Sequence, residues 1–198
     1  MSIDPEVFAI LLSAIMAIGL AAACGFRVFV PLLVLALAAR AEMLELSPGF
    51  AWIASTPALV CVAIATALEI GAYYVPWLDN TLDAVATPAA VVAGIVVAAA
   101  VMVDVDPWLR WSTATIAGGG AAALVQLPTV ALRAMSTAGT AGAGNPILSS
   151  AEVAASAAVA STAAVLPLAL PVVLVGIALP AGFWVRSRRR RSAHAGAV

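Results

Sequence analysis

The chain has 198 residues, of which 64% are hydrophobic and 10% are charged, and its mean hydropathy is +1.12. Soluble domains contain about 45–50% apolar and about 25% charged residues, so the composition excludes a soluble domain and predicts a membrane protein. The formal net charge is −1, but all nine basic residues are arginines, and five of them lie between positions 186 and 191. The positive-inside rule therefore predicts one transmembrane domain over residues 1–185 and a cytoplasmic arginine-rich tail over residues 186–198.

The first apolar run extends from Val7 to Ala39 and contains an arginine and a proline. As one straight helix it would be about 50 Å long, whereas the hydrocarbon core is about 30 Å thick. It must therefore bend, tilt or re-enter, and a break between Cys24 and Pro31 fits best. Arg27 would cost about 2.5–3.5 kcal/mol at a bilayer centre, and Pro31 would deprive the Arg27 carbonyl of its helical partner. We predict a broken helix that lines a polar cavity, with Arg27 and Pro31 at a substrate site.

The second span is expected from Phe50 to Tyr74 and carries Glu69. The acidic segment PWLDNTLD, residues 76–83, is expected to connect it to a third span. Thr87-Pro88 predicts the start of that span, since threonine is a good N-cap and proline suits the first helical position. The third span is expected to end near Val103.

The fourth span is predicted from about Trp111 to Ala134, and the glycine-rich segment from Ser136 to Pro146 is predicted to be a loop. Prolines interrupt the final apolar stretch, from Ser150 to Val185, beginning with Pro167, so this stretch should be kinked or broken. The expected fold is an all-α, polytopic membrane helical bundle with broken or re-entrant helices near both chain ends.

Five crossings follow from this pattern when the tail is placed inside. Glu6 then lies outside, Arg40 and Arg110 lie inside, and the segments 76–83 and 136–146 lie outside. Re-entrant hairpins would change the number of helices. The expected localisation is the inner membrane, with several crossings and a cytoplasmic C-terminus.

Four ionisable residues lie within the predicted spans or near their ends. Arg27 and Glu69 are the two furthest from any loop, and they are expected to pair, either as a functional site or as a structural ion pair. Glu152 is either a partner for a buried cation or the last residue of a capping box that begins at Ser149. Arg133 could pair with Glu152 or Glu69, or extend to the surface.

Asp79, Asn80 and Asp83 place oxygen ligands within one helical turn, where they could bind a divalent cation. Helix capping or turn formation is the alternative use of these residues. Two such motifs that hold magnesium on a diphosphate would suggest a prenyltransferase-like enzyme. The second acidic pair, Asp104 and Asp106, is expected on the opposite membrane face, so we expect no enzyme activity and no cofactor.

Four segments are characteristic in combination: CGFRVFVPLL (Cys24–Leu33), LEIGAYYVPWLDNTLD (Leu68–Asp83), TPAAVVAG (Thr87–Gly94) and GNPILSSAE (Gly144–Glu152). Together they resemble a bacterial membrane family, domain of unknown function 4126, over nearly the whole chain. The resemblance implies a small multi-pass inner-membrane protein with no assigned activity. GFRVFVP is also similar to the arginine-and-proline re-entrant motif of the DedA-type lipid-carrier translocases, which hints at a transport mechanism.

We therefore expect a transporter or translocase with a polar intramembrane site and a small anion or a lipid head group as substrate. The glycine-rich segment that ends at Asn145-Pro146 is expected to cover an outer vestibule and to take part in gating. Expected partners are membrane lipids, the substrate and, in a homo-oligomer, further copies of the chain, with no nucleic acid. The alternative is a non-catalytic membrane scaffold or assembly protein, with its buried charges satisfied internally and no pocket at Arg27.

Overall fold

A computed structural model of the chain describes residues 4–74 and 76–176, with the backbone alone for Pro5 and for residues 76–84. All regular elements in this part of the chain are helical, which confirms the predicted all-α class. Its labelled α-helices are α1 (Pro5–Cys24), α2 (Phe29–Arg40), α3 (Thr56–Ala72), α4 (Pro76–Val101), α5 (Pro107–Thr113), α6 (Gly119–Thr140) and α7 (Asn145–Val165). Residues 170–176, after α7, are also helical.

Three helical segments are long and apolar enough to cross a membrane, namely Glu6–Cys24, Pro107–Thr140 and Asn145–Val165. The second of them is continuous because a π-helical turn, η2 (Ala114–Gly118), joins α5 to α6. These helices make the chain a multi-pass membrane protein, as its composition predicts. The short 3₁₀-helices are η1 (Ala51–Ala54), before α3, and η3 (Pro167–Ala169), after α7.

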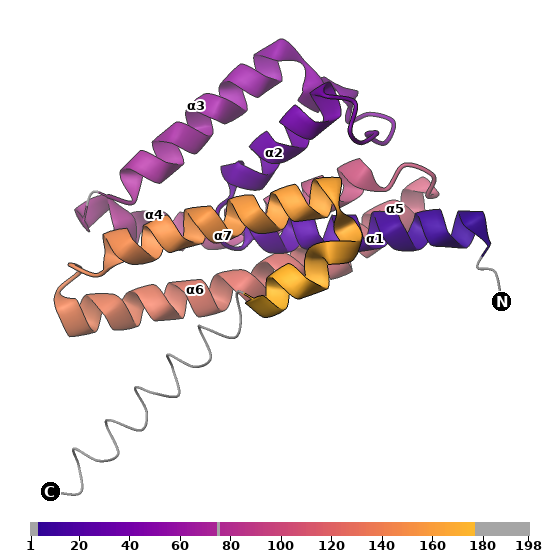
Figure 1. The fold of residues 1–198 in the computed structure, drawn as a ribbon. Coiled ribbons are helices and arrows are strands. Elements are labelled where there is room, and N and C mark those ends of the chain that lie inside the picture. Colours follow the sequence, from indigo (N-terminus) through magenta and orange to yellow (C-terminus); the bar gives the residue numbers. More distant parts are fainter. Residues whose placement is uncertain (1–3, 75, 177–198) are drawn as a thin grey trace, which may run out of the picture.

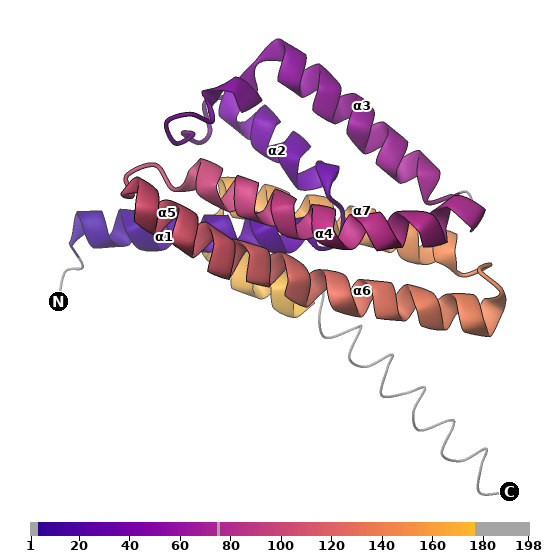
Figure 2. The same ribbon diagram turned by 180° about the vertical axis from the view of Figure 1, so that it is seen from behind.

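Helices α1, α4, α6 and α7 form the body of the bundle, while α2 and α3 lie to one side of it (Figures 1 and 2). α1 packs against α4, α6 and α7, and its last turns are buried. α3 packs mainly against α2 and exposes an apolar stripe of Val60, Ile64 and Leu68. α3 is therefore attached to the rest of the protein chiefly through α2.

Two glycines let α4 and the η2–α6 segment approach to backbone contact. A Cβ atom on Gly94 would lie 2.7 Å from the Ala122 side chain and 3.0 Å from the Gly118 carbonyl oxygen. A Cβ atom on Gly118 would lie 2.8 Å from the Gly94 carbonyl oxygen. Small residues at helix crossings are typical of membrane bundles, where packing rather than the hydrophobic effect drives association.

The first apolar run is broken where the sequence predicts. α1 ends at Cys24 and α2 begins at Phe29. A Cβ atom on Gly25 would lie 2.4 Å from the backbone oxygen of Ala122, so the break packs directly on α6. Pro31 falls in the first turn of α2, where its missing N–H leaves no helical hydrogen bond unmade.

α2 returns to the end of the bundle at which α1 begins (Figure 1). Glu6 in α1 and Glu45, beyond α2, line the same pocket as Asp104, beyond α4. We call this end, defined by these three residues, the Asp104 end. The opposite end, where α6 turns into α7, is the Asn145 end. α1 and α2 therefore form a hairpin whose tip points toward the Asn145 end.

The predicted placement of Glu6 and Arg40 on opposite membrane faces is therefore wrong, and with it the predicted order of five crossings. Arg40 ends α2, three residues before Met43 in the wall of that pocket. The first apolar run, from Val7 to Ala39, is compatible with either a bent crossing or a hairpin, so tertiary contacts determine which of the two forms. Ser156, in the middle of α7, donates its hydroxyl hydrogen to the Ala23 carbonyl at 3.0 Å, which stabilises the end of α1 inside the bundle.

The segment 76–83 is not a connector but the first turns of α4, which begins at Pro76. Pro88 lies inside this helix, so the predicted start of a span at Thr87-Pro88 is also wrong. An interior proline removes one backbone hydrogen bond, and neighbouring helices in a membrane bundle can offset that loss. Proline therefore marks a helix start less reliably here than in a soluble protein.

The predicted loop from Ser136 to Pro146 is mostly helical. α6 continues to Thr140 and α7 begins at Asn145, so only residues 141–144 form the turn. The hydroxyl of Thr140 donates to a carbonyl one turn earlier (2.7 Å) and accepts from the N–H of Gly144 (3.0 Å). These local hydrogen bonds close a tight turn, so no long loop between residues 136 and 146 covers the Asn145 end.

The helical segment that contains the fourth span begins at Pro107 rather than near Trp111, because Asp106 caps it and accepts a backbone N–H at 2.9 Å. The final apolar stretch is interrupted as predicted, since α7 ends at Val165, two residues before a proline. The tail predicted over residues 186–198 lies outside the described residues.

Candidate functional site

Arg27 lies in the break of the α1–α2 hairpin and is only 2% exposed. Its guanidinium reaches α7, where Nη2 donates to the hydroxyl oxygen (2.6 Å) and the carbonyl oxygen (3.2 Å) of Ser149. The same nitrogen forms an ion pair with Glu152 Oε2 at 2.9 Å. The cation predicted for the broken helix is thus held against α7.

A second buried arginine, Arg133 of α6, forms an ion pair with the same oxygen, Glu152 Oε2. Arg133 is 3% exposed and Glu152 is 7% exposed. We call Arg27, Arg133 and Glu152 the ion cluster. Two guanidinium groups from different elements therefore share one carboxylate oxygen inside the bundle.

Tyr73, at the C-terminal end of α3, covers the ion cluster. Its ring centroid lies 3.8 Å from Arg27 Cζ and 4.2 Å from Arg133 Cζ, within the range of cation–π attraction. The hydroxyl of the next residue, Tyr74, is hydrogen-bonded to that of Ser150 in α7 at 2.8 Å. The end of α3 is thus fastened over the ion cluster.

Glu69 of α3 binds the start of α2. Its carboxylate oxygens accept the backbone N–H groups of Val28 at 2.7 Å and Phe29 at 3.0 Å. The first N–H groups of a helix lack intrahelical partners, so this carboxylate caps α2 and interacts favourably with its dipole. Within the described residues Arg27 and Glu69 form no direct ion pair, because Arg27 pairs with Glu152. Both residues nevertheless act at the same break, since Glu69 binds the two residues that follow Arg27.

The interpretation of Glu152 as the end of a capping box is also wrong. α7 begins at Asn145, so Ser149 lies in its second turn and Glu152 one turn further on. Ser149 is fully buried and accepts a hydrogen bond from Arg27 instead of capping the helix. The alternative interpretation of Glu152, a partner for a buried cation, is confirmed.

The remaining predicted site residues lie apart from the ion cluster or beyond the described side chains. Pro31 is in the first turn of α2. Asn145 begins α7, and its Nδ2 donates to a threonine hydroxyl of α6 at 2.9 Å. Asp79, Asn80 and Asp83 belong to α4, but their side chains lie outside the described residues, so their cation site stays a prediction. In the described part of the chain, no three His, Cys, Asp or Glu side chains are grouped to hold a metal ion.

A polar stripe on α7 was not predicted. Asn145, Ser149, Glu152 and Ser156 are all buried and share one face of an otherwise apolar helix. The signal is present in the sequence, as polar residues at helical spacing, but the local capping-box pattern obscures it. Tyr73 gives no such signal, because aromatic residues near the ends of spans usually anchor at the membrane surface.

The family model described as Domain of unknown function (DUF4126) matches residues 14–188 of the chain. The chain belongs to the DUF4126 family. The match includes the break, the ion cluster and α7, and it confirms the family resemblance of the sequence. No curated protein and no solved structure is significantly similar to this DUF4126 chain, and the similarity to the DedA-type translocases stays a prediction.

The ion cluster offers guanidinium groups to an anion, but it is closed in this structure. All three of its residues are buried, and the pocket at the Asp104 end does not include Arg27 in its lining. Tyr73 and the last turn of α3 cover it. Among the described residues, these groups therefore separate the cluster from solvent.

Proposed function

We propose that this protein is a small membrane transporter or translocase that binds the anionic group of its substrate at the ion cluster. A small anion and a lipid head group are the favoured substrates, and no enzymatic step is proposed. The observation that carries the proposal is a buried arginine, in the break between α1 and α2, that keeps one N–H donor available. The Nε–H of Arg27 is buried and makes no hydrogen bond within the described residues.

An oxyanion would satisfy that donor. A buried N–H without a partner costs about 1–3 kcal/mol, and such groups in native proteins are usually met by water, an ion or a ligand. Guanidinium groups bind carboxylate and phosphate through two parallel N–H···O bonds. Glu152 holds the guanidinium of Arg27 in place, and an incoming anion would compete with Glu152 for it.

The start of α2 supports the same proposal. Half-helices whose N-termini face anionic groups inside the membrane are typical of transporters. Here the carboxylate of Glu69 occupies the N–H groups of Val28 and Phe29, next to Arg27. The break therefore combines a buried cation with the positive end of a helix dipole.

α3 is the element best placed to open the site. It carries both Glu69 and Tyr73, the two side chains that close the break and cover the ion cluster. It packs mainly against α2 and exposes its apolar stripe. Its displacement would therefore mainly break its contacts with α2, the Tyr73 ring contacts and the Tyr74–Ser150 hydrogen bond. Movement of α3 would uncover Arg27.

The second candidate function is a non-catalytic membrane scaffold or assembly protein. It is favoured by the burial of the ion cluster and by the absence of Arg27 from the lining of the pocket at the Asp104 end. In a scaffold the cluster would be a permanent structural element. No substrate would then depend on Arg27.

We also propose an inner-membrane location with a cytoplasmic C-terminus. The support is the run of arginines between positions 186 and 191, since positively charged segments stay on the cytoplasmic side.

Flux through proteoliposomes tests the proposed function. One arm measures exchange of a fluorescent anionic phospholipid between leaflets, and the other measures phosphate efflux, so the two substrate sources are separated. We expect activity in one arm for the wild type and for Arg40→Gln, a control that removes an exposed arginine of α2. Arg27→Gln should lower that activity at least about tenfold, the effect of about 1.4 kcal/mol. Equal activity of Arg27→Gln and the wild type, or no activity in either arm, would favour the scaffold.

A further inference from the structure

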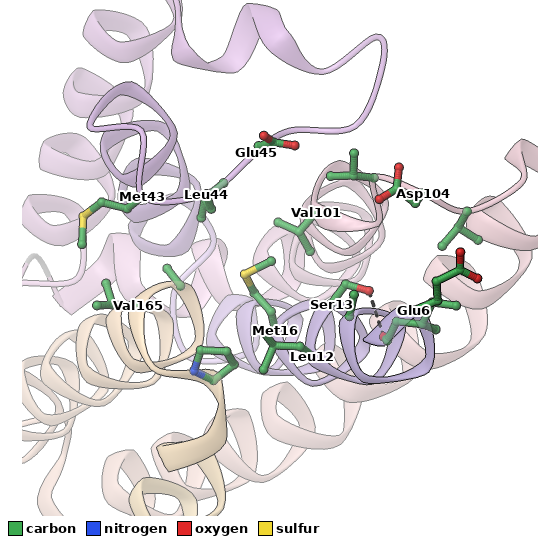
Figure 3. A pocket seen from close by; sticks show the side chains of 16 residues that line it. Glu6, Leu12, Ser13, Met16, Met43, Leu44, Glu45, Val101, Asp104 and Val165 are labelled. Atoms are coloured by element: carbon green, nitrogen blue, oxygen red, sulfur yellow. Dashed lines mark hydrogen bonds between the residues drawn. The ribbon is translucent and has the colours of Figure 1, made fainter. Parts of the chain in front are cut away.

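A second candidate site lies at the Asp104 end, apart from the ion cluster. A cavity of about 700 Å³ opens there between α1, the connector after α2, and the ends of α4 and α7 (Figure 3). Small-molecule sites typically have volumes of about 300–1,000 Å³. The cavity is therefore large enough for an organic molecule.

The wall of the cavity is apolar and its charges are all negative. Met16, Leu44, Val101 and Val165 contribute apolar surface. Its charged lining residues are Glu6, Glu45 and Asp104, and the described lining includes no arginine, lysine or histidine. In Figure 3 the carboxylates of Glu6 and Asp104 lie on one side of the cavity, and Met16 points into its middle.

The three carboxylates are available to a ligand. Glu6, Glu45 and Asp104 are exposed, and no hydrogen bond or ion pair within the described part of the chain engages their side chains. They also do not form a metal site, since no described group of three acidic, histidine or cysteine side chains could hold a metal ion. A compact metal ion therefore fits this arrangement less well than a larger cation.

We propose that this cavity binds an organic cation with an apolar body. The apolar wall would remove the body of the ligand from water, and the carboxylates would attract its positive charge. This site goes beyond the proposed function, because it lies elsewhere and selects ligands of the opposite charge.

Equilibrium dialysis against nanodiscs of zwitterionic lipid tests the site, with empty nanodiscs as the baseline. The probe is tetraphenylphosphonium, and tetraphenylborate is its counterpart of similar shape and opposite charge. We expect the full chain to bind the cation in preference to the anion, and 1 M salt to weaken binding because it shortens the Debye length to about 3 Å. Equal binding of the two probes overturns the proposal.

Each carboxylate that is neutralised should further weaken binding of the cation. An exposed charge pair contributes about two- to fivefold, so Glu6→Gln, Glu45→Gln and Asp104→Asn combined should lower affinity about tenfold or more. The matched controls are Glu42→Gln, on the same connector as Glu45, and Asp106→Asn, which retains a good helix cap. Neither control residue lines the cavity, and each should stay within about twofold of the wild type. Unchanged binding in the triple variant, or an equal loss in the controls, contradicts the proposal.

Two further variants distinguish an organic cation from the arginine-rich tail as the occupant of the cavity. Val165 is 48% exposed in the wall, so Val165→Trp should fill the cavity and reduce binding without lowering the melting temperature. Replacing the five arginines between positions 186 and 191 with glutamine tests the tail as a competitor. We expect these tail substitutions to leave binding unchanged. Binding that is found only in the tail-substituted chain would identify the tail as the occupant and overturn the proposal.

Discussion

Glu152→Gln is the substitution with the largest predicted effect on stability. Within the described residues, Glu152 supplies the one carboxylate that forms an ion pair with Arg27, and the same oxygen serves Arg133. At 2.9 Å, with an effective dielectric constant of about 20, the Arg27–Glu152 attraction alone is about 6 kcal/mol before desolvation. Removing one partner of a buried pair costs about 3–5 kcal/mol. At about 2–4 °C per kcal/mol for a chain of this size, the melting temperature should fall by about 6–20 °C.

Arg27→Gln is the matched comparison. It leaves Glu152 paired with Arg133, so no buried carboxylate loses its last ion-pair partner. We expect the melting temperature to fall by at least about 4 °C less than in Glu152→Gln. Thermal unfolding of both variants in one detergent, followed by tryptophan fluorescence, measures the difference. A larger loss for Arg27→Gln, or a loss below about 1 kcal/mol for Glu152→Gln, would refute the reasoning that one carboxylate holds two cations.

Three other predictions concern the hairpin and its cap. Gly25→Ala should lower the melting temperature, because its Cβ atom would meet an α6 carbonyl at 2.4 Å, whereas Gly120→Ala, with nothing within 4 Å, should not; equal shifts would contradict the close packing. Cysteines introduced at Glu6 and Met43, in a chain without its native cysteines, should both react with a membrane-impermeant maleimide added to the same side of the membrane. Labelling from opposite sides would exclude the α1–α2 hairpin. Glu69→Gln should cost about 1–2 kcal/mol in thermal unfolding, as loss of a helix cap does, and an unchanged stability would mean that the cap on α2 is dispensable.

The break in the first apolar run could be predicted from the sequence because single residues determine it. The run is too long for one straight crossing, and Arg27 is too polar to face lipid. A helix tolerates a proline such as Pro31 mainly in its first turn. These constraints act locally. They hold whichever helices surround the break.

The partner of Arg27 could not be predicted, because Glu69 and Glu152 are equivalent in terms of sequence. Each is one carboxylate in an apolar segment, and tertiary packing alone assigns one to the guanidinium and the other to the start of α2. The local pattern from Ser149 to Glu152 also favoured a helix start that the structure places one turn earlier. Long-range contacts thus override a short-range signal.

The ends of the helices were misassigned for a related reason. Under rules derived from soluble proteins, Pro88 and Gly139 indicate breaks in a helix. Inside a membrane bundle every backbone group needs a partner, so helices extend through such residues wherever neighbours support them. α4 and α6 both do so.

Native mass spectrometry of the purified protein tests the central claim, that the ion cluster binds an anionic group, most directly. We predict a bound anionic lipid or small anion in the wild type and in Arg40→Gln, and its loss in Arg27→Gln under conditions where all three remain folded. The same anionic species retained by Arg27→Gln, or no anion on the wild type, would contradict the account.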